Sequence, residues 1–202
     1  MKQLVFYVHG RGGSAAEAER YRSLFPDSEV LGLDYQTDTP WEAGPEIRAG
    51  LLEAHGEGRN VILIANSIGA FFCMSAGIEK LVQKAYFISP IVDMERLIAD
   101  MMAWSGVTEA ELESRGVIPT AGGEDLSWEY LCWVRAHPIH WTVPTELLYG
   151  SGDVLTARET AAAFAQRHNA GLTVMENGEH WFHTDEQLAF LDRWLLEKEQ
   201  GT

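Results

Sequence analysis

Short runs of apolar residues alternate with longer segments of helical character along most of the chain. A short, continuous apolar run bounded by polar or glycine-containing turns is typical of a strand buried on both faces of a parallel sheet. Such runs lie at residues 4–8, 30–33, 61–65, 85–88, 145–149 and 172–175. Helices are predicted near residues 15–25, 45–54, after residue 67, and at 158–167 and 185–199. This alternation predicts a three-layer α/β/α fold with about six parallel strands.

The first two helices carry start signals. Ser14 follows the turn made by residues 10–13, and Glu17 stands three positions later, which is the pattern of a capping box. Pro45 is suited to the first turn of the second helix, where proline loses no helical hydrogen bond.

Residues 91–142 interrupt the alternation, and no strand is predicted in them. Helical stretches near 94–104, 109–114 and 126–134 are separated by glycine-containing loops. The segment is rich in aromatic and methionine side chains, namely Trp104, Trp128, Trp133, Trp141, Met94, Met101 and Met102. Two interpretations are open: these side chains fill a small core of their own, or they line a pocket for an acyl or alkyl group. We therefore expect a single domain over residues 1–202 with a helical, cap-like insertion at 91–142.

Composition and charge narrow the possible partners. The 202 residues are 46% hydrophobic and 22% charged, as in soluble globular proteins. The net charge of −15 argues against nucleic acid or an anionic membrane as a partner. No stretch approaches the roughly 20 apolar residues of a membrane span, and the apolar run at the N-terminus is too short for a signal peptide. We therefore expect a cytoplasmic protein without membrane insertion.

The two cysteines, Cys73 and Cys132, form no metal or redox motif and are too few for a disulfide framework. Cys73, on the helix that follows Ser67, is expected to fill space in the protein core. No metal site is predicted.

The segment around Ser67 carries the strongest chemical signal. A buried strand ending near Ala65 is followed by a helix from about Phe71, so the connecting turn must be tight. A residue that joins a strand to a helix in one step is held in strained backbone geometry with its side chain pointing outward. The small residues Ala65 and Gly69 leave room for this crossing. Ser67 is therefore a candidate nucleophile, and the N–H of Ile68 is a candidate oxyanion donor.

Two further candidates follow later strands in the order that such a site needs. Asp153 stands in a glycine-rich loop after the fifth predicted strand, and His180 stands in the loop after the sixth. A histidine can take the proton of the serine, and a carboxylate can fix the imidazole tautomer. His183 is an alternative base, and Asp93, after the fourth strand, is an alternative acid.

Other polar residues have structural interpretations. Asp185 is expected in the first turn of the last helix, and Asp34 is expected to cap a loop at the end of a strand. His137 and His140 are interpreted as structural or pocket-lining residues. Arg11 in the glycine loop is either exposed or placed to meet a substrate carboxylate.

These motifs together resemble those of the α/β-hydrolase superfamily over nearly the whole chain. The motifs are His9-Gly10, Ala65-Asn66-Ser67-Ile68-Gly69, Tyr149-Gly150-Ser151-Gly152-Asp153 and Gly178-Glu179-His180. The resemblance implies a Ser67–His180–Asp153 triad and an oxyanion hole made by the N–H groups of Ile68 and Arg11. It implies that His9 shapes the oxyanion loop, and that the first two strands of the family's sheet are absent. The turn at Ser67 departs from the family's usual pattern G-x-S-x-G in two ways: Ala65 replaces the first glycine, and Asn66 precedes the serine.

Two functions of other classes must be weighed. Residues 10–15 match the pattern G-x-G-x-x-A after a strand, and Asp34 ends the next strand, as in dinucleotide-binding oxidoreductases. That interpretation leaves Ser67, Asp153 and His180 unexplained. A non-catalytic binding protein with the same fold is the second rival, although a missing triad residue would be its usual sign.

The sequence thus predicts a serine hydrolase that needs no cofactor and cleaves a small or medium acyl ester through an acyl-enzyme. A carboxylic ester is the expected substrate class, while thioesters, amides and lactones stay open because the same triad serves them all. Trp104, Trp128, Trp133 and Trp181 are the candidate substrate-pocket residues. The oligomeric state cannot be read from the chain.

Overall fold

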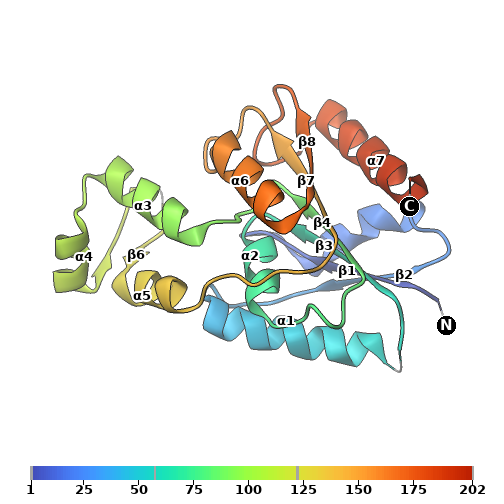
Figure 1. Ribbon diagram of the computed structural model, residues 1–202, viewed down its shortest axis with the longest axis horizontal. Helices are drawn as coiled ribbons and strands as arrows, with labels where there is room; N and C mark the ends of the chain where they lie inside the picture. Colours follow the sequence, from blue (N-terminus) through green and yellow to red (C-terminus); the bar gives the residue numbers. More distant parts are fainter. Residues whose placement is uncertain (1, 57, 122, 202) are drawn as a thin grey trace. The chain divides into compact units, whose positions relative to one another are not determined.

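The structure, a computed structural model, describes residues 2–56, 58–121 and 123–201. A six-stranded sheet with strand order β2-β1-β3-β4-β7-β8 forms its centre (Figure 1), and every neighbouring pair is parallel. The strands are β1 (Leu4–Val8), β2 (Glu29–Leu33), β3 (Val61–Asn66), β4 (Lys84–Ile88), β7 (Thr145–Gly150) and β8 (Gly171–Met175). The predicted parallel α/β fold is confirmed.

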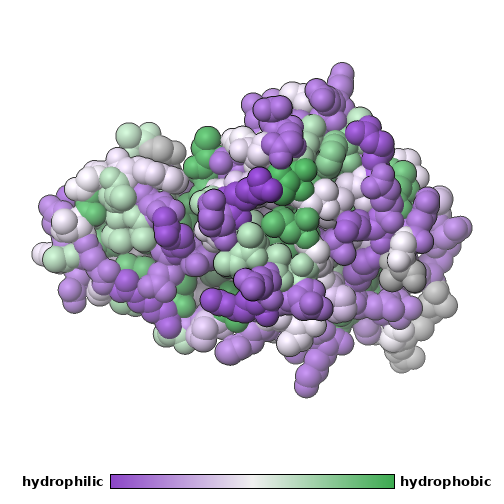
Figure 2. Space-filling view, turned by 45° about the horizontal axis from the view of Figure 1, so that its top comes forward, coloured by the Kyte–Doolittle hydropathy of each residue, from purple (hydrophilic) through white to green (hydrophobic). Residues whose placement is uncertain are grey.

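Helices cover both faces of the sheet, as the continuous apolar strands require. On one face, η1 (Ala15–Ser23) and α7 (Asp185–Gln200) pack in a core cluster with residues such as Tyr7 of β1 and Ile64 of β3. The opposite face is covered by α1 (Pro40–His55), α2 (Ile68–Ser75) and α6 (Arg158–His168). In the part of the chain that is described, no helix is both long and apolar enough to cross a membrane. On the face shown in Figure 2, hydrophilic residues predominate and hydrophobic residues appear in patches between them.

Two helices differ from their predicted form. The first is a 3-10 helix that ends at Ser23, although its capping box of Ser14 and Glu17 is present as predicted. The second begins at Pro40, five positions before the expected Pro45. Proline is favoured at the first helical position, so Pro40 gives the same signal as Pro45, which lies in the second turn.

The strand order brings the candidate residues to one edge of the sheet. The chain passes from β1 to β2 on one side and then returns to place β3 on the other side of β1. Loops that leave the carboxyl ends of β1 and β3 therefore run in opposite directions, which opens a crevice between them in sheets of this type. Arg11 follows β1 and Ser67 follows β3, so both lie at this switch point.

Residues Asp93–His140 form a second compact unit within the chain. It contains α3 (Met94–Ser105), α4 (Glu109–Arg115) and α5 (Trp128–Ala136). The prediction that this segment has no strand is wrong, because β5 (Val117–Ile118) and β6 (Leu126–Ser127) pair antiparallel. Two-residue strands are too short to show alternation. Ser127 also caps α5, and its hydroxyl accepts the N–H of Tyr130, so that helix starts after the predicted position.

The core of the second unit is aliphatic and methionine-rich rather than aromatic. Its buried side chains include Met94, Ile98, Met102, Ile118, Leu112, Leu126 and Leu131. Trp104 is 60% exposed, and Trp128 and Trp133 are only partly buried. The interpretation that the tryptophans fill a core of their own is therefore wrong for Trp104.

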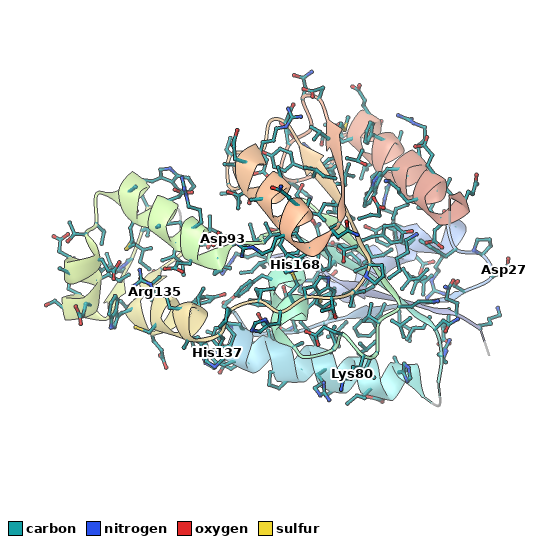
Figure 3. All side chains as sticks on the ribbon, in the orientation of Figure 1. Asp27, Lys80, Asp93, Arg135, His137 and His168 are labelled. Carbon is teal, nitrogen blue, oxygen red and sulfur yellow. The ribbon has the colours of Figure 1, made fainter. Side chains whose placement is uncertain are left out.

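Ion pairs of Arg135 connect the three helices of this unit, whereas Trp141 lies outside the unit. Arg135 of α5 (Figure 3) forms ion pairs with Glu95 of α3 and Glu109 of α4 at 2.7 and 2.6 Å. Trp141, by contrast, belongs to the first unit, where it is buried and packs on Phe87 of β4.

Candidate active site

The turn at Ser67 is tighter than the sequence indicated. β3 continues to Asn66 and α2 starts at Ile68, so Ser67 alone joins them, with φ 51° and ψ −122°. Its N–H donates to the carbonyl of Ile88, and its own carbonyl accepts the N–H of Ile91. These two bonds hold a backbone conformation that residues with a side chain rarely adopt.

Gly69 is required by a close approach of another loop. A Cβ atom added at Gly69 would lie 2.3 Å from the carbonyl oxygen of His9, and one added at Gly10 would lie 3.1 Å from Cβ of Ser67. The loop that leaves β1 therefore passes directly over the start of α2. Ala65 is fully buried in β3, where the backbone accommodates its methyl group.

The conformation of Ser67 predicts a measurable strain. A residue other than glycine in this region costs about 1–3 kcal/mol. We expect Ser67→Gly to be more stable than Ser67→Ala by about 1 kcal/mol, because glycine adopts a positive φ without steric conflict. Urea denaturation of the two variants measures the difference. Equal midpoints, or a more stable alanine variant, would contradict a strained turn.

The side chains of Ser67, His180 and Asp153 form one continuous chain of hydrogen bonds. Oγ of Ser67 lies 2.8 Å from Nε2 of His180, and Nδ1 of His180 lies 2.7 Å from Oδ2 of Asp153. With the proton on Nδ1, the histidine donates to the carboxylate and accepts from the serine hydroxyl. The three residues come from the loops after β3, β8 and β7, and they meet at the carboxyl edge of the sheet.

The carboxylate of Asp153 is held from both sides. Its side chain is fully buried, and Oδ1 accepts the N–H groups of Leu155 and Thr156 at 2.8 and 3.0 Å. Oδ2 is left to face the imidazole of His180. These two N–H donors were not predicted from the sequence, because they are backbone groups. They follow from a turn that Asp153 itself closes.

The alternative base and acid have other partners. Nδ1 of His183 lies 2.7 Å from the carbonyl of Trp181 and 3.3 Å from Glu179. Asp93 stands at the start of α3 (Figure 3), where it accepts the N–H of Arg96 as an N-cap. Asp185 lies in the first turn of α7, as expected.

The loop after β1 is a tight turn beside Ser67. The N–H of Gly13 donates to the carbonyl of Gly10, and Gly12 has φ 71°, which leaves Arg11 and Gly12 at the corners of the turn. Arg11 is exposed at its side chain, which forms an ion pair with Asp38 at 3.2 Å. Ile68 lies in the first turn of α2, where N–H groups have no partner within the helix. Both N–H groups predicted as oxyanion donors therefore belong to the segments that flank Ser67.

His9 is buried and shapes this loop. The His9 ring stacks on the ring of Tyr35 with 4.3 Å between centroids, and Nδ1 of His9 lies 2.7 Å from the carbonyl oxygen of Gly10. The Tyr35 hydroxyl donates to the backbone carbonyl of His9 at 2.9 Å. The role of Tyr35 was missed in the sequence, since a tyrosine after a strand gives no sign of where its hydroxyl reaches.

The elements of the dinucleotide pattern have partners within the fold. Oδ1 of Asp34 accepts the N–H of Ala15 at 2.6 Å, so this carboxylate caps η1. The glycines form the tight turn beside Ser67 rather than the start of an α-helix.

The remaining candidates lie outside the hydrogen-bonded chain. Trp181 is 70% exposed next to His180, and its ring stacks on His183 at 4.7 Å. His168, on α6 (Figure 3), has its Nδ1 2.8 Å from the carbonyl of Trp141 and is structural. Burial raises the pKa of the Cys73 thiol, which disfavours the reactive thiolate. Among the described residues, no group of three or more His, Cys, Asp or Glu side chains is placed to hold a metal ion.

Comparison with known proteins supports the fold. No family model matches the chain, and no curated protein matches its sequence. Est1E from Butyrivibrio proteoclasticus aligns with a TM-score of 0.79 and 15% identity, over 99% of this chain and 88% of its own. The alpha/beta hydrolase domain-containing protein 10 from mouse aligns at 0.73 and 18%, covering 98% and 90%. A putative hydrolase from Agrobacterium vitis aligns at 0.75 and 17%, covering 96% and 88%. Together with the sheet and the serine turn, these alignments show that the chain has the α/β-hydrolase fold.

Proposed function

We propose that this protein is a serine hydrolase that cleaves a small or medium carboxylic ester through an acyl-enzyme. The observation that carries the proposal is the unbroken chain of two hydrogen bonds from Ser67 through His180 to Asp153. Each group has the role that its position allows: the serine attacks, the histidine moves the proton, and the carboxylate orients the histidine.

In the first half of the reaction, the hydroxyl of Ser67 attacks the ester carbonyl while Nε2 of His180 takes its proton. The imidazolium then gives that proton to the leaving alcohol, and the C–O bond of the ester breaks. In the second half, water attacks the acyl-serine, and His180 takes a proton from the water and returns it to Ser67. The acid product leaves, and the enzyme is restored without any cofactor.

Charge on the substrate oxygen develops beside the start of α2. The N–H of Ile68 and the N–H of Arg11 are the proposed donors to this oxygen. A donor of this kind typically contributes about 3 kcal/mol to transition-state stabilisation. The partial positive charge at the N-terminus of α2 acts in the same direction.

The proposed substrate class rests on an exposed aromatic residue and on the similar structures. Trp181 directly follows the base and is 70% exposed, so its ring is accessible to an apolar acyl group. Among the similar structures are an esterase domain from a Rhodothermus marinus protein and a structure of Est1E with ferulic acid bound.

A panel of p-nitrophenyl esters and a fluorophosphonate probe test this function. We expect the wild-type protein to bind one fluorophosphonate covalently and to hydrolyse the butyrate ester faster than the acetate, because a longer acyl chain buries more apolar surface. Trp181→Ala should reduce this preference by roughly three- to tenfold, the worth of about one buried methylene group.

Outcomes that count against the proposal are equally direct. A folded protein that takes no probe and hydrolyses no ester would falsify the hydrolase assignment and would favour a non-catalytic binding protein. A preference for charged, polar esters, or a chain-length preference that Trp181→Ala leaves intact, would exclude the contact between Trp181 and an apolar acyl group. The hydrolase assignment itself would stand.

A further inference from the structure

A buried tyrosine lies behind the loop that carries the proposed oxyanion donor. Tyr7 is the fourth residue of β1, only 1% exposed, and its hydroxyl donates to Oε2 of Glu17 in η1. This contact spans two elements on the same face of the sheet. A buried hydroxyl that meets a carboxylate makes a charge-assisted hydrogen bond, stronger than one between neutral groups.

The other oxygen of Glu17 holds the end of the loop. Oε1 accepts the N–H of Ser14 at 3.2 Å, and a Cβ added at Gly13 would lie 2.5 Å from this oxygen. The carboxylate therefore rests against the backbone of Gly13 and Ser14, while the carbonyl of Gly10 accepts the N–H of Gly13. Through these contacts Glu17 fixes the turn that contains Arg11.

The same tyrosine reaches the residue before the nucleophile. The side chain of Asn66 also acts on the Tyr7 hydroxyl, because its hydrogen bonding works against the rise in the pKa of Tyr7. Asn66 ends β3 and is followed directly by Ser67. One phenol thus contacts both sides of the proposed site: the support of the oxyanion loop, through Glu17, and the start of the serine turn, through Asn66.

Tyr7 is well suited to a fixed donor role. Burial, with smaller contributions from Tyr21 and Glu17, raises the pKa of Tyr7 far above its usual range. The hydroxyl therefore keeps its proton at any pH at which the protein would be assayed. Its ring is also held, because it lies 5.3 Å from the ring of Tyr21 in the core.

We propose that Tyr7 and Glu17 are positioning residues. They set the distance between the N–H of Arg11 and the substrate carbonyl oxygen, which becomes negatively charged when Ser67 attacks. This role rests on the proposed hydrolase function. A small displacement of an oxyanion donor weakens a contact that counts in the transition state more than in substrate binding. Loss of the pair should therefore lower kcat and leave KM nearly unchanged.

The fold offers a matched control. Tyr86 of β4 is also fully buried, and its hydroxyl also donates to a carboxylate, that of Glu199 near the end of α7. Tyr86→Phe removes the same kind of bond from the same sheet, and no hydrogen bond described for Tyr86 leads to Ser67 or to the loop after β1. A purely structural role of Tyr7 would make the two variants alike.

The test compares Tyr7→Phe with Tyr86→Phe on p-nitrophenyl butyrate. We expect Tyr7→Phe to lower kcat by about tenfold with KM changed less than about twofold, a part of the loss seen when such a donor is removed. Tyr86→Phe should change kcat less than about twofold. Glu17→Gln, which keeps the shape but offers one acceptor oxygen in place of two, should resemble Tyr7→Phe. It also replaces Tyr7→Phe in the test should that variant not fold.

Hydrogen exchange gives a readout that does not depend on turnover. The amides of residues 12–14 should exchange faster in Tyr7→Phe and Glu17→Gln than in the wild type or in Tyr86→Phe. Equal kcat in the two tyrosine variants of an active enzyme would overturn the positioning role and leave the hydrolase function standing. An inactive wild type would refute both the hydrolase function and the positioning role. Unchanged exchange at residues 12–14 in Tyr7→Phe and Glu17→Gln would be enough to refute the proposal that Tyr7 and Glu17 hold this loop.

Discussion

Replacing Ser67 or His180 by alanine is expected to lower kcat for p-nitrophenyl butyrate by about 10⁶-fold. Without the serine hydroxyl no acyl-enzyme forms, and without the imidazole the hydroxyl keeps its proton. The two residues act as one unit, since Oγ and Nε2 are 2.8 Å apart. The double variant should therefore be no slower than either single variant. Steady-state rates of the three proteins, with fluorophosphonate labelling, measure the effect.

His183→Ala is the control for the histidine. This residue stands three positions after His180, but its Nδ1 faces the carbonyl of Trp181. Its loss should cost less than about tenfold in kcat, through the position of the Trp181 ring. If His183→Ala lost as much as His180→Ala, the base would be wrongly assigned. Labelling that survives in Ser67→Ala would show that another residue is the nucleophile.

Replacing Asp153 by asparagine is expected to lower kcat by about 10⁴-fold while the protein stays folded. The amide oxygen can keep accepting the N–H groups of Leu155 and Thr156, which now bond to Oδ1. The amide nitrogen would then face Nδ1 of His180 and donate to it. That contact favours the tautomer with the proton on Nε2, and such a histidine cannot take the proton of Ser67.

Asp93→Asn is the matched control for the carboxylate. Asp93 caps α3, and asparagine is about as good an N-cap as aspartate. We expect kcat within about twofold of the wild type and an unchanged thermal midpoint. A large loss in Asp93→Asn together with a small one in Asp153→Asn would move the orienting role to the other aspartate.

The parts of the fold that rest on local pattern were predictable. Each strand of the main sheet is an apolar run that the chain marks by itself, and the loops after β3, β7 and β8 carry Ser67, Asp153 and His180 in the expected order. The meeting of these three side chains follows because the carboxyl ends of parallel strands share one edge. The sequence therefore predicted both the sheet and the residues that the structure brings together.

The parts that rest on long-range contact were not predictable. The pairing of β5 with β6 depends on a fold of the second unit that two-residue strands cannot announce. The hydroxyls of Tyr7 and Tyr35 find Glu17 and the carbonyl of His9 only after the sheet and η1 have packed. A sequence shows that these residues are aromatic and suited to a core. It does not show which acceptor the tyrosine hydroxyl reaches in the folded protein.

The division of the chain has a consequence for how such a protein changes over time. Ser67, Asp153, His180 and the loop after β1 all belong to the first unit, which the second interrupts as one uninterrupted stretch, Asp93–His140. A single insertion or exchange of a gene segment, with junctions near residues 92 and 141, would replace that stretch and leave every proposed reacting group in place. A single recombination event could thus replace the second unit while the proposed catalytic residues of the first unit are retained.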